Sequence, residues 1–231
     1  MARALPLFSI ALAVLLATPS VVTAKAPDTW DNLIKVKSTK LEAVYLLPNA
    51  DFRSYTKVMI DPTQVAFQKD WQSTINDQAV GLSGRINDTD ANAIAAKART
   101  GFESIVAKAF SDAGYQVVTT AGPGVLRLST AVLNLYINAP DPDDDNVGNS
   151  YTAEAGQATV VIEARDSQTG AVLGRAIDEK IAGDYPSQRT SMTNRDDFSD
   201  LFKTWAKTSV NGLGELKAMS PINTEGQPSS R

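Results

Sequence analysis

The chain contains neither cysteine nor histidine among its 231 residues. Without cysteine it forms no disulfide, so its hydrophobic core must hold the fold together. Without histidine it lacks the usual general base and the base of Ser-His-Asp or Cys-His nucleophile systems. The two absences together exclude zinc sites built on histidine or cysteine. A glycine-rich phosphate loop is missing as well, because Gly122–Gly124 has only two glycines and opens no predicted helix.

Charge is nearly absent from the first 24 residues, where Arg3 is the sole charged side chain. Leu7–Leu16 forms an apolar stretch that is too short to span a bilayer comfortably, and Val22–Ala24 supplies small residues for cleavage. This pattern predicts a secretory signal peptide over residues 1–24, cleaved after Ala24. We therefore expect a periplasmic or secreted protein, with no lipid anchor because no cysteine can be acylated.

The mature chain is acidic. Removal of the signal peptide takes away one arginine, so 22 basic residues become 21 against 26 acidic ones, a net charge of −5. This balance argues against nucleic acid or an anionic membrane surface as a partner. No later apolar stretch is long enough to span a membrane, so no transmembrane segment is expected in the mature chain.

The hydrophobic patterns predict an α+β fold, a two-layer sandwich. Two amphipathic helices are expected to cover one face of a mostly antiparallel sheet of about four or five strands. One helix should begin at Asp88 or Thr89 and stop at Gly114. The other should begin near Asn194, with Asp196–Asp197 in its first turn, where the helix dipole favours negative charge.

Three features of the strands are predicted. The stretch Lys57–Phe67 reads as a strand in which Pro62 interrupts the ladder, because proline cannot donate to it. The alternation in Val125–Asn138 changes parity, which predicts a bulge or bend near Ala131. A hairpin is expected over Gly156–Gly183, with its turn at the Ser-Gln-Thr-Gly stretch.

The predicted organisation after the signal peptide is simple. Residues 25–43 form an extended lead-in, and residues 44–217 form a single α+β domain. Residues 218–231 form a disordered tail, because they carry two prolines and little apolar matter.

An acidic loop follows the long strand. Asp141, Asp143 and Asp145 have the alternate spacing that brings carboxylates around a calcium ion. An EF-hand loop then needs glycine at its sixth position and glutamate at its twelfth, where this chain has Asn146 and Thr152. The three aspartates are therefore the candidate metal ligands, but the pattern favours a solvated link between strands.

No catalytic residue and no cofactor are predicted. The stretch Ser54–Lys57 matches the Ser-x-x-Lys spacing of penicillin-binding enzymes, but the lysine leads into a strand and no Lys-Thr-Gly exists. Carboxylates on the hairpin could in principle act as an acid/base pair, as in glycoside hydrolysis, but nothing in the sequence sets their separation. These carboxylates are Glu163, Asp166, Asp178 and Glu179.

Four sequence segments resemble those of a known family and stand in the same order. They are Tyr45–Phe67, Ile137–Asp141, Glu163–Asp178 and Phe202–Ala206. Together they resemble the bacterial envelope family of unknown function DUF3313 over nearly the whole mature chain. The resemblance implies an envelope location and a small α+β domain, with no activity and no site residues. Many members resemble lipoproteins, and this chain departs from them in having no cysteine to acylate.

The leading hypothesis is therefore an exported, non-catalytic cell-envelope protein that acts as a protein-binding or ligand-binding accessory module. Its expected partner is an envelope protein or a cell-wall component. The alternative is a carboxylate-based hydrolase, or a ligand-binding protein, that acts on cell-wall material. A third hypothesis is stabilisation by calcium through the acidic loop. The sequence predicts no oligomeric state.

Overall fold

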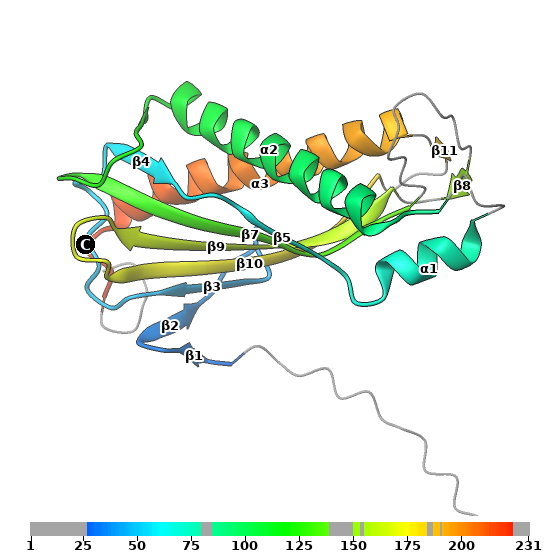
Figure 1. The fold of residues 1–231 in the computed structure, drawn as a ribbon. Helices are drawn as coiled ribbons and strands as arrows, with labels where there is room; N and C mark the ends of the chain where they lie inside the picture. Colours follow the sequence, from blue (N-terminus) through cyan, green and yellow to red (C-terminus); the bar gives the residue numbers. More distant parts are fainter. Residues whose placement is uncertain are drawn as a thin grey trace, which may run out of the picture.

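The computed structural model describes residues 27–79, 85–138, 150–152, 155–183, 187–189 and 191–223 (Figure 1). The predicted signal peptide and the acidic loop with Asp141, Asp143 and Asp145 lie outside these residues. The elements are β1 (Thr29–Trp30), β2 (Leu33–Val36), β3 (Ala43–Leu46), β4 (Lys57–Ile60), β5 (Gln64–Phe67), α1 (Trp71–Gln78), α2 (Asp88–Asp112), β6 (Gln116–Val117), β7 (Val125–Ile137), β8 (Ser150–Thr152), β9 (Gly156–Asp166), β10 (Val172–Ala182), β11 (Ser187–Arg189) and α3 (Ser191–Met219).

The α+β class is confirmed, but the sheet is larger than predicted. Within the described residues nine strands form one mixed sheet in the order β1-β2-β3-β10-β9-β7-β4-β6, with β5 also paired to β7. The strands β4 and β5 run parallel to β7, and β4 also pairs in parallel with β6, while the remaining pairs are antiparallel. The predicted count of four or five was too low because β1, β2 and β6 have two to four residues, too few to show periodicity.

Described residues on both sides of the stretch 44–217 also contact the domain. The strands β1 and β2 lie in the predicted lead-in, yet they pair into the main sheet. At the other end α3 runs to Met219, and Ile222 is buried at 1% exposure. The Ile222 carbonyl accepts from the Asn49 N–H at 2.8 Å, and its own N–H donates to the Ala50 carbonyl at 2.9 Å. Residues 220–223 therefore belong to the packed domain.

Two long helices cover one face of the sheet (Figure 1). The core between the layers includes an edge-to-face pair, Phe102 from α2 and Phe202 from α3, with ring centroids 5.2 Å apart. The third helix, α1, was not among the two predicted. It packs at a separate small cluster, where Trp71 stacks on Phe67 at 4.0 Å between ring centroids.

The helix α2 begins at Asp88, as predicted, whereas α3 begins earlier than predicted. The N-cap of α2 is Asn87 rather than Asp88 or Thr89. The Asn87 side chain accepts from the N–H groups of Thr89 and Asp90, while Asp90 accepts from the Asn87 N–H. Its predicted stop at Gly114 is confirmed by a left-handed φ of 87°. The helix α3 begins at Ser191, so Asp196–Asp197 do not lie in its first turn.

The long strands behave largely as predicted. The predicted strand is divided into β4 and β5, and Pro62 lies in the link between them. The β9–β10 hairpin closes through a turn in which Gly170 has φ 72°. The irregularity in β7 lies at Asn134 rather than near Ala131, since the register with β9 shifts between Leu133 and Tyr136. Asn134 has φ 50°, a left-handed value that asparagine tolerates better than most residues.

Candidate functional site: a cavity between the sheet and helix α3

A cavity of about 320 Å³ lies between the sheet and the two long helices. Its walls come from β3, β7, β9 and β10 on one side and from α2 and α3 on the other. Residues 37–42, named here the capping segment, connect β2 to β3, and five of them line the cavity. The walls are mostly apolar, and their apolar side chains include Leu46, Phe52, Phe110, Leu126, Leu128 and Leu213.

The alternation of the strands builds these walls. In β7 the side chains of Leu126, Leu128 and Thr130 are buried, whereas Arg127 between them is exposed. Space remains beside them because small residues face the same region. The small residues of the walls are Ala164 in β9, Gly174 and Ala176 in β10, and Gly212 in α3.

Gly212 is the clearest sign of free space in the wall. A Cβ built at this position meets no atom within 4 Å, although the residue lines the cavity. Gly214 has equal freedom, but it is exposed and lines a separate, more open hollow, not this cavity. The two glycines thus form a natural pair for substitution, one at the cavity and one outside it.

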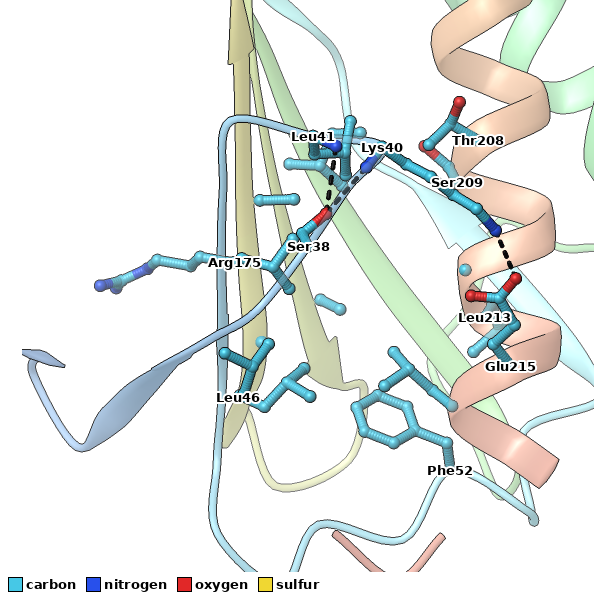
Figure 2. A pocket seen from close by; sticks show the side chains of 18 of the residues that line it. Ser38, Lys40, Leu41, Leu46, Phe52, Arg175, Thr208, Ser209, Leu213 and Glu215 are labelled. Atoms are coloured by element: carbon cyan, nitrogen blue, oxygen red, sulfur yellow. Dashed lines mark hydrogen bonds and ion pairs between the residues drawn. The ribbon is translucent and has the colours of Figure 1, made fainter. Parts of the chain in front are cut away.

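The rim of the cavity is hydrophilic and consists of Lys37, Thr39, Lys40 and Glu215, which are all exposed. Figure 2 shows the Lys40 side chain reaching from the capping segment to Glu215 on α3, with which it forms an ion pair. The Ser38 hydroxyl accepts from the N–H groups of Lys40 and Leu41 at 3.2 and 3.1 Å. This local turn holds the capping segment in shape beside the opening.

A buried carboxylate ties the far end of the capping segment to the sheet and α3. Asp178 on β10 accepts from the Trp205 indole N–H at 2.8 Å and from the Glu42 N–H at 3.1 Å. It also forms an ion pair with Lys180 at 2.7 Å. Its exposure is only 4%, so these three partners replace water around the carboxylate.

The opposite face of the sheet carries a charged cluster around Arg175. The backbone of Arg175 lies at the cavity, but its side chain points away from it (Figure 2). Its guanidinium pairs with Glu163 and Asp31, each at 2.5 Å, and lies 4.5 Å from the centre of the Trp30 ring. Burial by itself would lower the pKa of Arg175, but the two carboxylates raise the pKa above its ordinary value.

The structure does not bring the predicted carboxylates together. Glu163 lies in the charged cluster and Asp178 lies in the core with Trp205, while Glu179 is exposed. Asp166 accepts from the Gln168 and Thr169 N–H groups in the hairpin turn, and the bonds from Thr169 help to hold its pKa below the usual range. None of these four carboxylates is among the described residues that line the cavity.

Two other predicted features can be placed. Ser54 lies in a turn and Lys57 is the first residue of β4, so the pair does not share a helix as penicillin-binding enzymes require. The aspartates of the acidic loop lie outside the described residues. In the part of the chain that the structure describes, no group of three or more Asp or Glu side chains is arranged to hold a metal ion.

The cavity itself was not predicted from the sequence. The capping segment falls in the predicted lead-in, and its contact with α3 joins residues about 170 positions apart, as the Lys40–Glu215 separation of 175 shows. One local signal was present. Gly212 and Gly214 interrupt an amphipathic helix, and a glycine inside a helix costs about 1 kcal/mol against alanine, so such a residue often has a packing reason.

Comparisons with solved structures show only distant likeness. The chain is similar to the PelC dodecamer from Paraburkholderia phytofirmans (14% identity, 74% of this chain and 95% of that chain, TM-score 0.38). It is also similar to protein XCC0632 from Xanthomonas campestris (12%, 75% and 91%, TM-score 0.41). A third is a putative neuraminyllactose-binding hemagglutinin homolog from Helicobacter pylori (9%, 74% and 89%, TM-score 0.36). These TM-scores are low, so the likenesses carry no functional argument.

Two further comparisons concern the sequence. A search of curated proteins finds no match. Among the described residues, no helix combines the length and the apolar character needed to cross a membrane. The predicted family resemblance is confirmed, and the chain belongs to the DUF3313 family of proteins of unknown function, whose model matches residues 24–209.

Proposed function

We propose that this protein is an exported, non-catalytic binding protein of the cell envelope, and that it holds an apolar ligand in the cavity between the sheet and α3. The observation that carries the proposal is the cavity itself. Its volume of about 320 Å³ and its apolar walls match the usual character of small-molecule sites, which measure about 300–1,000 Å³. The hydrophilic rim forms the opening through which such a ligand can enter the cavity from solvent.

The apolar walls of the cavity support this proposal. Because the cavity opens to water at its rim, these walls contact water when no ligand is bound. Removing apolar surface from water contributes about 25 cal/mol for each Å², so an apolar ligand that covers the walls gains binding free energy. A ligand that binds only the folded chain would also raise the stability of the fold.

The arrangement of polar groups supports binding rather than catalysis. The hairpin carboxylates serve structural contacts on different faces of the sheet, as described above. The polar groups at the rim are two lysines, one carboxylate and hydroxyl groups, which suit recognition of a ligand. No observation favours the alternative of a hydrolase that acts on cell-wall material.

Export remains part of the proposal and rests on the sequence. Residues 1–24 are proposed to act as the signal peptide, with cleavage after Ala24 and no lipid anchor. Expression of the full chain in a bacterium, followed by osmotic shock and intact mass measurement, tests this. A periplasmic species that begins at Lys25 is expected. A cytoplasmic species of 231 residues would contradict export.

Binding is tested with N-phenyl-1-naphthylamine, a neutral apolar dye whose fluorescence rises when it leaves water. The wild-type protein should bind it saturably at one site per chain. Gly212→Leu should abolish this binding, because the leucine side chain enters the space beside the helix. Gly214→Leu is the matched control, since it makes the same change two residues away on an exposed position. Both variants gain close to 1 kcal/mol of helix propensity, so neither should lose stability.

The outcome that would contradict the proposed function is equally specific. If the wild type shows no saturable signal, or if Gly212→Leu binds the dye as well as Gly214→Leu does, the cavity is not the ligand site.

A further inference from the structure

We infer that the ligand is a single-chain amphiphile with an anionic head group, bound with its chain in the cavity and its head at the rim beside Lys40. This inference rests on the proposed function and specifies its ligand class. Two observations carry it, namely the size and apolar character of the interior and the charge of the rim.

The interior fits one hydrocarbon chain. The cavity offers about 320 Å³. A methylene group occupies a volume similar to that of a water molecule, about 30 Å³, so the space holds on the order of ten carbon atoms. A lipid with two long chains would need several times this volume. The side chains that the chain would touch come from both layers and are apolar, including Leu46, Phe52 and Leu213.

The rim favours a negative head group. The rim contains two lysines, Lys37 and Lys40, and one carboxylate, Glu215, so the opening has an excess of positive charge. The Ser38 hydroxyl also lines the cavity, and a hydroxyl group can donate to a carboxylate or a phosphate, whereas the Ser209 hydroxyl donates to the Trp205 carbonyl at 2.8 Å. An anionic head would meet both kinds of donor.

The Lys40–Glu215 pair is suited to exchange partners. Its side chains are 49% and 52% exposed, and exposed ion pairs contribute little to stability. An incoming anion can therefore replace Glu215 beside Lys40 without a large loss. The capping segment would keep its place during this exchange, because Ser38 holds its turn and Asp178 holds the Glu42 N–H.

The experiment is a competition against bound N-phenyl-1-naphthylamine with three ligands that share one chain and differ in charge. They are decanoate, decan-1-ol and decyltrimethylammonium, all used below micelle-forming concentrations near neutral pH. The wild type should prefer decanoate to decan-1-ol by about fivefold, the size expected of one exposed charge pair. Decyltrimethylammonium should compete least.

Two variants test the role of the pair. Lys40→Gln should remove the preference for decanoate over decan-1-ol, because no positive charge is left beside the head group. Glu215→Gln should strengthen decanoate binding by about fivefold, because the carboxylate no longer competes for the lysine. The control is Lys203→Gln, which breaks another exposed pair on α3, with Asp200, away from the rim.

The outcomes separate the inference from the proposed function. If the dye binds in the cavity but the three ligands displace it equally, or the cation displaces it best, the anionic amphiphile is refuted and the binding function stands. Retention of the preference in Lys40→Gln would also refute it. If the dye does not bind to the wild type, both fail together.

Discussion

Replacing Asp178 with alanine should destabilise the domain strongly, because this carboxylate joins three parts of the fold. It accepts from Trp205 on α3 and from Glu42 in the capping segment, and it pairs with Lys180 on its own strand. In the variant the Trp205 indole N–H keeps its buried position but has no acceptor from Asp178. The loss of the carboxylate therefore affects both the core and the attachment of the capping segment.

The magnitude follows from the three contacts. A buried donor left unsatisfied costs about 1–3 kcal/mol, and this applies fully to the Trp205 N–H and only in part to the N–H of the exposed residue Glu42. The pair with Lys180 adds less than about 1 kcal/mol, because the lysine side chain is 36% exposed. The expected loss is about 3–4 kcal/mol, which lowers the melting temperature by about 10 °C in a domain of this size.

Urea unfolding at neutral pH measures the loss, and amide hydrogen exchange at Glu42 shows where it acts. Asp178→Asn keeps one acceptor oxygen and should lose about half as much. The control is Glu179→Ala, an exposed neighbour whose replacement should change stability by less than about 0.5 kcal/mol. A loss below about 1 kcal/mol in Asp178→Ala, with the Glu42 amide still protected, would refute the reasoning.

Three other substitutions have defined outcomes. Gly156→Ala should cost about 3 kcal/mol or more in thermal unfolding, because φ is 153° and an added Cβ would lie 1.9 Å from the Tyr136 carbonyl oxygen; a near-neutral result would contradict this contact. Hydrogen bonds from Thr169 hold the pKa of Asp166 below its usual range. The Asp166 carboxylate therefore contributes to the stability of the fold above about pH 4, and this contribution fades as the pH falls below that value. Asp166→Asn should therefore destabilise at pH 7 and much less at pH 3, and an equal loss at both would refute the assignment. Asn87→Ala should cost about 1 kcal/mol by removing the cap of α2, measured by urea unfolding, and no loss would contradict the capping role.

The features that could be predicted from the sequence are those with local causes. The β9–β10 hairpin follows from its turn residues, and the buried face of α2 follows from spacings of three and four. Phe102, Val106 and Phe110 on that face are buried as expected. The stop at Gly114 likewise depends on one residue that tolerates a left-handed backbone.

The features that could not be predicted depend on contacts between distant residues. The parallel pairing of β4 and β5 with β7 leaves no local signature, and strands of two to four residues are too short for a hydrophobic period. Ile222 has no helical or strand pattern around it, and its burial and its backbone hydrogen bonds to Asn49 and Ala50 keep the chain packed there. The cavity could not be predicted for the same reason, because its rim is formed by the capping segment and α3, which lie far apart in the sequence.

The most direct test of the central claim is methyl NMR of the labelled protein during titration with decanoate. The claim predicts shifts for the cavity methyl groups of Leu126, Leu128 and Leu213, saturating at one ligand per chain. The methyl groups of Leu33 and Ile75 belong to separate buried clusters and should not move. Shifts confined to Leu33 or Ile75, or no saturable shift at the cavity, would contradict the claim that the cavity holds the ligand.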